Sequence, residues 1–102
     1  MKKTLLVLAA LVAAGAAQAQ ANDTLKKIKD SGAVTMGVRE SSGALSFTLG
    51  DGKYVGYHVE LCQRVLADVQ RALGLAKLDI KYQPVTSQNR IPLVQNGTVD
   101  IE

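Results

Sequence analysis

The sequence predicts an α/β fold in which helices flank a mainly parallel sheet. Short runs rich in β-branched apolar residues alternate along the chain with amphipathic runs of helical period. Glycine or a short polar segment separates each run from the next. The length of 102 residues permits one small domain at most, which excludes a barrel or a two-domain enzyme.

The first twenty residues have the three-part pattern of a secretory signal peptide. Residues 1–3 carry two lysines, residues 5–17 form an unbroken run of 13 apolar or small residues, and residues 17–19 form an A-x-A cleavage site. A second A-x-A site allows cleavage as late as residue 21. The alternative is a membrane anchor, but a span needs about 20 apolar residues. We therefore assign residues 1–19 to a signal peptide and expect an exported chain.

Composition excludes several other classes of function. The 12 basic residues outnumber 9 acidic ones, but Lys2 and Lys3 lie in the signal peptide, and without them 10 face 9. Four aromatic residues and no tryptophan offer no base-stacking surface, so we expect no nucleic-acid partner. Cys62 is alone and lies among apolar neighbours, which predicts a small buried side chain. The alternative is a catalytic thiolate with His58 as its base, but no surrounding signature supports it.

The exported part is expected to begin with a short helix and a buried strand. Residues 22–24 favour the start of the helix, and residues 30–32 favour its end. Residues 33–38 are apolar and β-branched, which predicts a buried strand, and residues 39–43 have the composition of a loop.

A hairpin is expected next. Residues 45–47 are expected to be briefly extended, residues 50–52 to turn and residues 53–57 to form a short strand. Tyr54 and Tyr57 are expected to pack this hairpin against the rest of the domain.

The clearest helix follows and ends at Gly74. Its apolar residues recur at spacings of three and four: Cys62, Val65, Leu66, Val69, Ala72 and Leu73. Residues 78–85 predict a second main strand, and a short helix begins at Ile91 with Pro92 in its first turn. Residues 98–101 begin a third main strand, in which the chain ends. We therefore expect a piece of a longer protein, because such a sheet would have an open edge.

Two loops are expected at the edge of the sheet where ligands bind. In open α/β sheets this edge lies beyond the carboxyl ends of the strands. One loop begins at Arg39, and the other spans residues 86–90. Each carries an arginine, whose planar fork matches a carboxylate in two parallel hydrogen bonds, and the helix at Ile91 adds N-terminal amides that favour an anion. Arg39 and Arg90 therefore suit a ligand with two carboxylates.

The alternative for both arginines is a surface ion pair. Arg39 then pairs with Glu40, and Arg90 with Asp100. No cluster of His, Cys and carboxylate residues has the spacing of metal ligands, so neither a metal nor another cofactor is expected.

The run TSQNRIPLVQNGTVD at residues 86–100 resembles the glutamate/aspartate-binding proteins of bacterial ABC importers. These proteins belong to solute-binding protein family 3 and have the type II periplasmic-binding-protein fold. Residues 37–42 resemble the first ligand loop of the family, and residues 55–57 with the helix after them resemble its next block. The resemblance implies that residues 22–102 are the N-terminal part of lobe 1 of a solute-binding domain.

The resemblance also implies which residues bind the ligand. Arg39, Ser87 and Arg90 match family positions that hold the carboxylates of the amino acid. Ser41 and Ser42 are further candidates, which shape the first loop. Neither arginine is assigned to the α-carboxylate or to the side-chain carboxylate.

The function implied is that of a non-enzymatic, monomeric periplasmic protein that binds L-glutamate or L-aspartate between two lobes. It would deliver this ligand to the membrane permease of an ABC importer. Two alternatives use the same fold. One is an exported dehydratase-like enzyme for a small carboxylate, for which only Glu40 or His58 could be the acid or base. The other is the sensor module of a membrane receptor.

Overall fold

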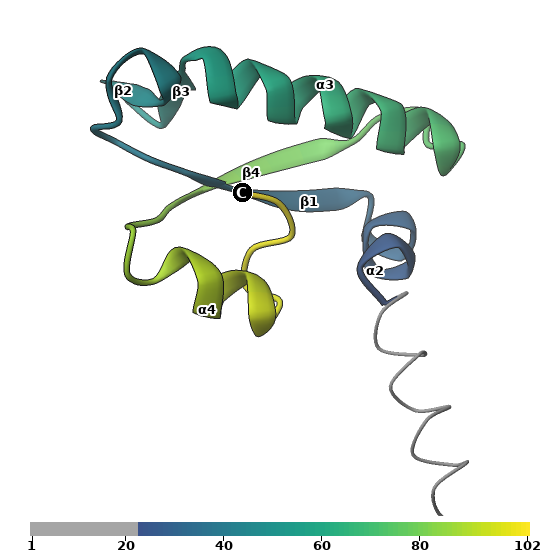
Figure 1. Ribbon diagram of the computed structural model, residues 1–102. Helices are drawn as coiled ribbons and strands as arrows, with labels where there is room; N and C mark the ends of the chain where they lie inside the picture. The colour runs from purple at the N-terminus through teal and green to yellow at the C-terminus, as the bar shows by residue number, and fades with distance from the viewer. Residues whose placement is uncertain (1–22) are drawn as a thin grey trace, which may run out of the picture.

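The computed structural model describes residues 23–102, so the expected signal peptide lies outside the described residues. Helices and strands alternate as the sequence predicts (Figure 1). The elements are α2 (Asp23–Ser31), β1 (Ala33–Val38), the 3-10 helix η1 (Gly43–Leu45), β2 (Phe47–Gly50), β3 (Lys53–Val55), α3 (Tyr57–Ala72), β4 (Asp79–Pro84) and α4 (Arg90–Gln95).

The main sheet is parallel, as predicted. Strands β1 and β4 pair in register from Ala33 opposite Asp79 to Val38 opposite Pro84. Ile101 forms a parallel bridge to Met36. The third main strand expected at residues 98–101 is therefore reduced to this bridge among the described residues. All three segments run in the same direction, so their carboxyl ends meet at one edge of the sheet.

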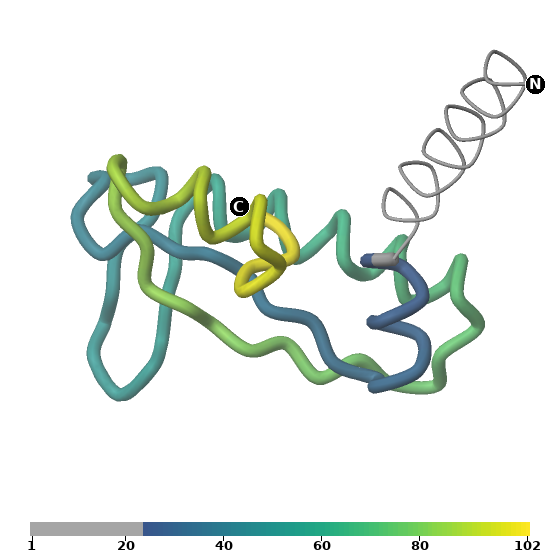
Figure 2. Tube along the Cα trace, turned by 90° about the horizontal axis from the view of Figure 1, so that it is seen from below, coloured from purple at the N-terminus to yellow at the C-terminus, as the bar shows by residue number. Residues whose placement is uncertain are grey.

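Helices cover both faces of this sheet. Helix α3 runs along one face, α4 lies against the other, and α2 sits beside the amino end of β1 (Figure 1). The β2–β3 hairpin lies at the opposite end of the molecule from α2, as the view from below also shows (Figure 2). The carboxyl edge of the sheet faces the hairpin end.

The core lies between α3 and the sheet. Its buried residues are Ile28, Val34, Met36, Val38, Val59, Cys62 and Leu66. Alternate residues of β1 point toward α3, as the period of two requires, and Met36 at the centre has no exposed surface. Ile80 and Tyr82 pack against this core from β4.

The buried face of α3 differs from the predicted one. Leu66 is 2% exposed, but Val65 beside it is 49% exposed, and Ala72 is also exposed. Val59, which the predicted face omits, is buried. The predicted period is right, because Val59, Cys62 and Leu66 recur at spacings of three and four, but the helix begins at Tyr57 and its buried face starts in the first turn.

The hairpin differs from the prediction at both ends. Leu45 lies in η1 rather than in an extended segment, and β3 ends at Val55 rather than at residue 57. The backbone of Gly56 has a φ of +135°, and a Cβ atom there would lie 2.3 Å from the carbonyl oxygen of Leu45. Only glycine fits this approach, which ends the strand and starts the helix.

Of the two hairpin tyrosines, only Tyr54 packs against the domain. Its ring stacks on Tyr82 of β4 with 5.9 Å between the ring centroids. Tyr57 is 64% exposed, so the expectation that it packs the hairpin is wrong.

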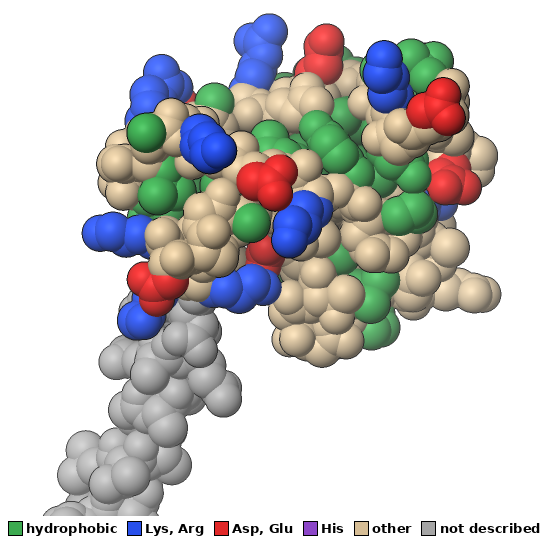
Figure 3. Space-filling model, turned by 180° about the vertical axis from the view of Figure 1, so that it is seen from behind, with side chains coloured by type: hydrophobic (Ala, Val, Ile, Leu, Met, Phe, Trp, Pro, Cys, Tyr) green, Lys and Arg blue, Asp and Glu red, His purple; other side chains and the backbone are tan. Residues whose placement is uncertain are grey.

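The face of the molecule seen in Figure 3 carries charges of both signs. Figure 3 shows Lys and Arg side chains interspersed with Asp and Glu, with apolar side chains between them. Within residues 23–102, no helix combines the length and the hydropathy that crossing a membrane requires.

Candidate functional site

The structure brings the two arginine-bearing loops together at the carboxyl edge of the sheet. The amide of Val85 donates to the carbonyl oxygen of Val38 at 2.8 Å, which ties the ends of β1 and β4. Beyond this contact, residues 39–41 of the first loop and residues 84–86 of the second line a cavity of about 200 Å³. The parallel register therefore brings the two loops to one edge of the sheet, as the sequence predicts. Arg39 lines this cavity, whereas Arg90 does not.

The backbone of Arg39 is fixed by a buried serine. The amide of Arg39 donates to Ser46 Oγ at 3.1 Å, and Ser46 Oγ donates to the carbonyl oxygen of Arg39 at 2.7 Å. Ser46 is buried and has both of these partners, so it anchors the loop at little desolvation cost. Sequence reasoning missed Ser46, because its role depends on a contact across the loop.

The side chain of Arg39 forms no ion pair with any residue of the described part of the chain. The ion pair with Glu40, which was the alternative to ligand binding by Arg39, does not form. Glu40 instead accepts a long hydrogen bond of 3.4 Å from the hydroxyl of Tyr54. Burial raises the pKa of Tyr54, and the Glu40 carboxylate raises it further.

The two serines of the first loop have different surroundings. Ser42 closes the η1 turn through its backbone, since its amide donates to the carbonyl oxygen of Ser46 at 2.9 Å. Ser41 is exposed and forms a bridge to Phe47. Both shape the loop through their backbones, and only their side chains remain for a ligand.

A compact turn positions Arg90 in the second loop. The amide of Thr86 donates to Asn89 Oδ1 at 2.7 Å, and the amide of Asn89 donates to Thr86 Oγ1 at 3.2 Å. The amide of Arg90 donates to the carbonyl oxygen of Thr86 at 3.1 Å. Pro92 has no N–H. The start of α4 therefore offers fewer free amides to an anion than the sequence predicts.

Ser87 lies at the tip of this turn. Its side chain is exposed and makes no hydrogen bond with the residues that the structure describes. It lines neither cavity at this edge of the sheet.

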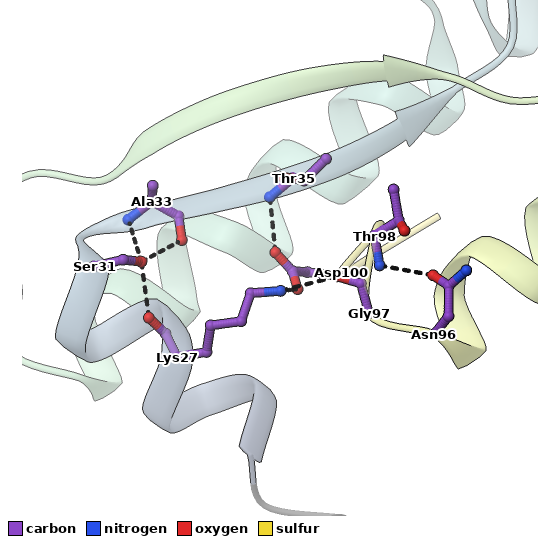
Figure 4. Close-up of polar contacts among 8 residues, drawn as sticks. All are labelled: Lys27, Ser31, Ala33, Thr35, Asn96, Gly97, Thr98 and Asp100. Carbon is purple, nitrogen blue, oxygen red and sulfur yellow. Dashed lines mark hydrogen bonds and ion pairs between the residues drawn. The ribbon is translucent and has the colours of Figure 1, made fainter.

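Arg90 pairs with Glu102 rather than with Asp100. Arg90 Nη1 lies 3.2 Å from Glu102 Oε2, and the side chains are 43% and 15% exposed. Asp100 accepts instead from Lys27 Nζ at 2.7 Å and from the amide of Thr35 at 2.9 Å (Figure 4). The alternative pairing of Arg90 with Asp100 is therefore wrong, and both carboxylates of the C-terminal segment have separate partners.

A second cavity, of about 270 Å³, connects Glu102 with the first loop. Arg39, Ser42 and Glu102 line it from the sheet side, with His58 and Leu61 on α3. Glu102 thus reaches both arginines, touching Arg90 directly and sharing this cavity with Arg39. Sequence reasoning missed Glu102, and one feature of the sequence could have pointed to it. Gly37 lies within a β-branched strand, and a glycine in such a strand often marks a place where another segment approaches closely.

Cys62 has the properties of a core residue. Its Sγ atom lies 3.6 Å from His58 Nε2. This is the pair that the alternative of a catalytic thiolate requires. Burial raises the pKa of the Cys62 thiol, and the negative charge of Glu102 raises it further. These effects disfavour the thiolate that catalysis requires. No three His, Cys or carboxylate side chains between residues 23 and 102 lie close enough to hold a metal ion.

Comparison with known proteins places the chain among binding proteins. The family model of the bacterial extracellular solute-binding proteins, family 3, matches residues 34–102. The L-glutamate/L-aspartate-binding protein of Pseudomonas aeruginosa is 47% identical over 98 residues, which cover 94% of this chain and 32% of that protein. The glutamate/aspartate import solute-binding protein of Escherichia coli K12 is 42% identical over 101 residues, covering 94% and 33%.

A solved structure supports the same fold. An ancestral cationic amino acid solute-binding protein superimposes with a TM-score of 0.61 at 22% identity, covering 74% of this chain and 30% of that one. The expected type II periplasmic-binding-protein fold is confirmed, as a partial domain. The chain spans about one third of the length of the curated relatives it matches. The chain belongs to family 3 of the bacterial extracellular solute-binding proteins, and the relatives named above are solute-binding proteins rather than enzymes.

Proposed function

We propose that this chain is the N-terminal part of lobe 1 of a periplasmic solute-binding protein for L-glutamate and L-aspartate. Residues 1–19, or at most 1–21, act as the signal peptide, and residues 22–102 form the lobe segment. The protein works as a monomer and delivers its ligand to the membrane permease of an ABC importer. Arg39, Ser87 and Arg90 contact the carboxylates of the ligand, and Ser41 and Ser42 complete the first loop.

One observation carries this proposal. Two arginines follow different strands, and the parallel register brings their loops to the same edge of the sheet. A dicarboxylic amino acid carries two anionic groups that such a pair can bind, and each charge-assisted hydrogen bond contributes roughly 1.5–3 kcal/mol. The names of the two relatives described above point to the same ligands.

The test uses a chimera that supplies the remaining part of a binding protein. Residues 22–102 of this chain replace the matching third of the Pseudomonas aeruginosa relative, which is 47% identical. Titration calorimetry then measures the affinity for L-glutamate, L-aspartate, L-glutamine and L-arginine. We expect binding of the two acidic amino acids and no binding of L-arginine.

Point variants assign the binding residues. Arg39→Ala and Arg90→Ala are each expected to weaken L-glutamate binding by at least about a hundredfold, since each removes a bidentate charge-assisted contact. Arg64→Ala is the matched control, because Arg64 is exposed on α3. If both site variants bind as tightly as the control, the assignment of the arginines is wrong. If the chimera prefers L-glutamine or L-arginine, the proposed ligand class is wrong.

A further inference from the structure

We propose that Glu102 is a positioning residue, which holds the guanidinium of Arg90 in the orientation that meets a ligand carboxylate. The inference rests on the proposed function and adds a residue that contacts no ligand itself. The supporting observation is the Arg90–Glu102 pair, with 3.2 Å between Nη1 and Oε2.

The surroundings of the pair favour a fixed geometry. The Glu102 side chain is only 15% exposed, so it is confined, whereas the Arg90 side chain is 43% exposed and needs a partner to stay in one rotamer. An unrestrained arginine side chain loses about 2 kcal/mol of rotamer entropy when it is fixed. A partner that fixes it before the ligand arrives reduces this cost at the moment of binding.

Gly37 makes the approach of Glu102 possible. A Cβ atom on Gly37 would lie 3.1 Å from Glu102 Cγ, 3.2 Å from Glu102 Cβ and 3.0 Å from Val99 Cγ1. The amide of Gly37 also donates to the carbonyl oxygen of Ile101 at 2.8 Å. The C-terminal segment therefore lies close against β1, and the stem of Glu102 occupies the space where another residue would carry its side chain.

The two arginines of the site are thus held in different ways. Arg39 is fixed at its backbone by Ser46, and its side chain forms no ion pair in the described part of the chain. Arg90 follows a turn and is fixed at its side chain by Glu102. Contacts within the chain therefore fix the backbone of Arg39 and the guanidinium of Arg90.

Glu102 supports Arg90 without blocking it. The pair uses one nitrogen, Nη1, of a guanidinium that carries five N–H donors. The other donors remain for a ligand carboxylate, and the half-exposed side chain leaves them accessible. A carboxylate that competed with the ligand would instead lower the affinity, so removing it would improve binding.

A double-mutant cycle in the chimera separates positioning from a general structural effect. Glu102→Gln is nearly isosteric and removes the charge that holds Arg90. We expect it to weaken L-glutamate binding about tenfold, and Glu102→Asp, which is one methylene shorter, to weaken it less. In an Arg90→Lys background, which has no planar guanidinium to orient, Glu102→Gln is expected to change the affinity less than twofold. Glu60→Gln is the charge-matched control, because Glu60 is exposed on α3.

Each outcome has one meaning. A tenfold loss that disappears in the Arg90→Lys background, with equal melting temperatures, supports the inference. Unchanged or tighter binding by Glu102→Gln refutes it, as does an equal loss in both backgrounds. If Glu102→Gln fails to fold, the same comparison is made with Glu102→Asp. If the parent chimera binds no acidic amino acid, the proposed function fails first and this inference fails with it.

Discussion

Replacing Asp100 by alanine is expected to destabilise the fold far more than replacing a surface aspartate. The Asp100 carboxylate is 3% exposed and accepts from Lys27 Nζ at 2.7 Å and from the Thr35 amide at 2.9 Å. These contacts join helix α2, strand β1 and the C-terminal segment at one point (Figure 4). Alanine would leave the Thr35 amide without its acceptor in a half-buried position.

The size of the effect follows from the two contacts. A hydrogen bond from a backbone amide to a carboxylate contributes about 1.5–3 kcal/mol. The contact with Lys27 contributes less, about 0.5–1 kcal/mol, because the lysine side chain is 51% exposed and solvent screens its charge. We therefore expect Asp100→Ala to lower the free energy of unfolding by about 2–4 kcal/mol.

Asp30→Ala is the matched control. Asp30 pairs with Lys26 at 2.8 Å, but the two side chains are well exposed, so its loss is expected to cost about 0.5 kcal/mol at most. Urea unfolding of the chain, followed by far-UV circular dichroism, measures both. At the usual slope for small domains, Asp100→Ala should lower the midpoint by about 1–2 M. Equal midpoints for the two variants would refute the distinction between the buried and the exposed pair.

Three further predictions concern the packing of α3. Gly56→Ala is expected to prevent the native junction between hairpin and helix, because its Cβ would lie 2.3 Å from the Leu45 carbonyl oxygen; loss of dispersion in the amide NMR spectrum would show this. Leu66→Ala is expected to lower the free energy of unfolding by about 2–5 kcal/mol and Val65→Ala by less than about 1 kcal/mol, since only Leu66 is buried. Comparable urea midpoints for the two variants would contradict the side of the helix that the structure buries. The raised pKa of Cys62 leaves its thiol protonated at pH 8, so alkylation by iodoacetamide is expected to be slow until urea unfolds the chain; rapid labelling of the folded chain would contradict its burial.

The sheet could be predicted from the sequence because its signals are local. Strand β1 has the predicted bounds of residues 33–38, and β4 lies inside the predicted run of residues 78–85. Continuous β-branched runs separated by helical periods are typical of parallel strands. The positions of the two arginine loops then follow from the direction of these strands.

The start of α3 could not be predicted in the same way. The expected strand at residues 53–57 includes Tyr57, an aromatic residue of a type common in strands, whereas the structure places Tyr57 in the first turn of the helix. What decides between the two is the close approach of Gly56 to Leu45, a contact outside the reach of any periodic pattern.

The partner of Arg90 depends on contacts that are distant in sequence. Asp100 and Glu102 are both plausible partners by spacing alone. In the structure Asp100 lies beside Lys27 of the first described helix, and Glu102 lies beside Arg90. The partner of Asp100 is 73 residues away in sequence, so this pairing is visible only once the chain has folded.

The contacts of Asp100 also determine when the fold can form. The carboxylate that holds the Thr35 amide lies 65 residues further along the chain, and the contact with Lys27 spans 73 residues. Closing such long loops carries an entropy cost before any contact compensates for it, and domains rich in distant contacts fold slowly. During synthesis, both edges of strand β1 are therefore occupied only after residues 79–84 and Ile101 have been made. Until then the unpaired N–H and C=O groups along the edges of β1 stay available to pair with another strand.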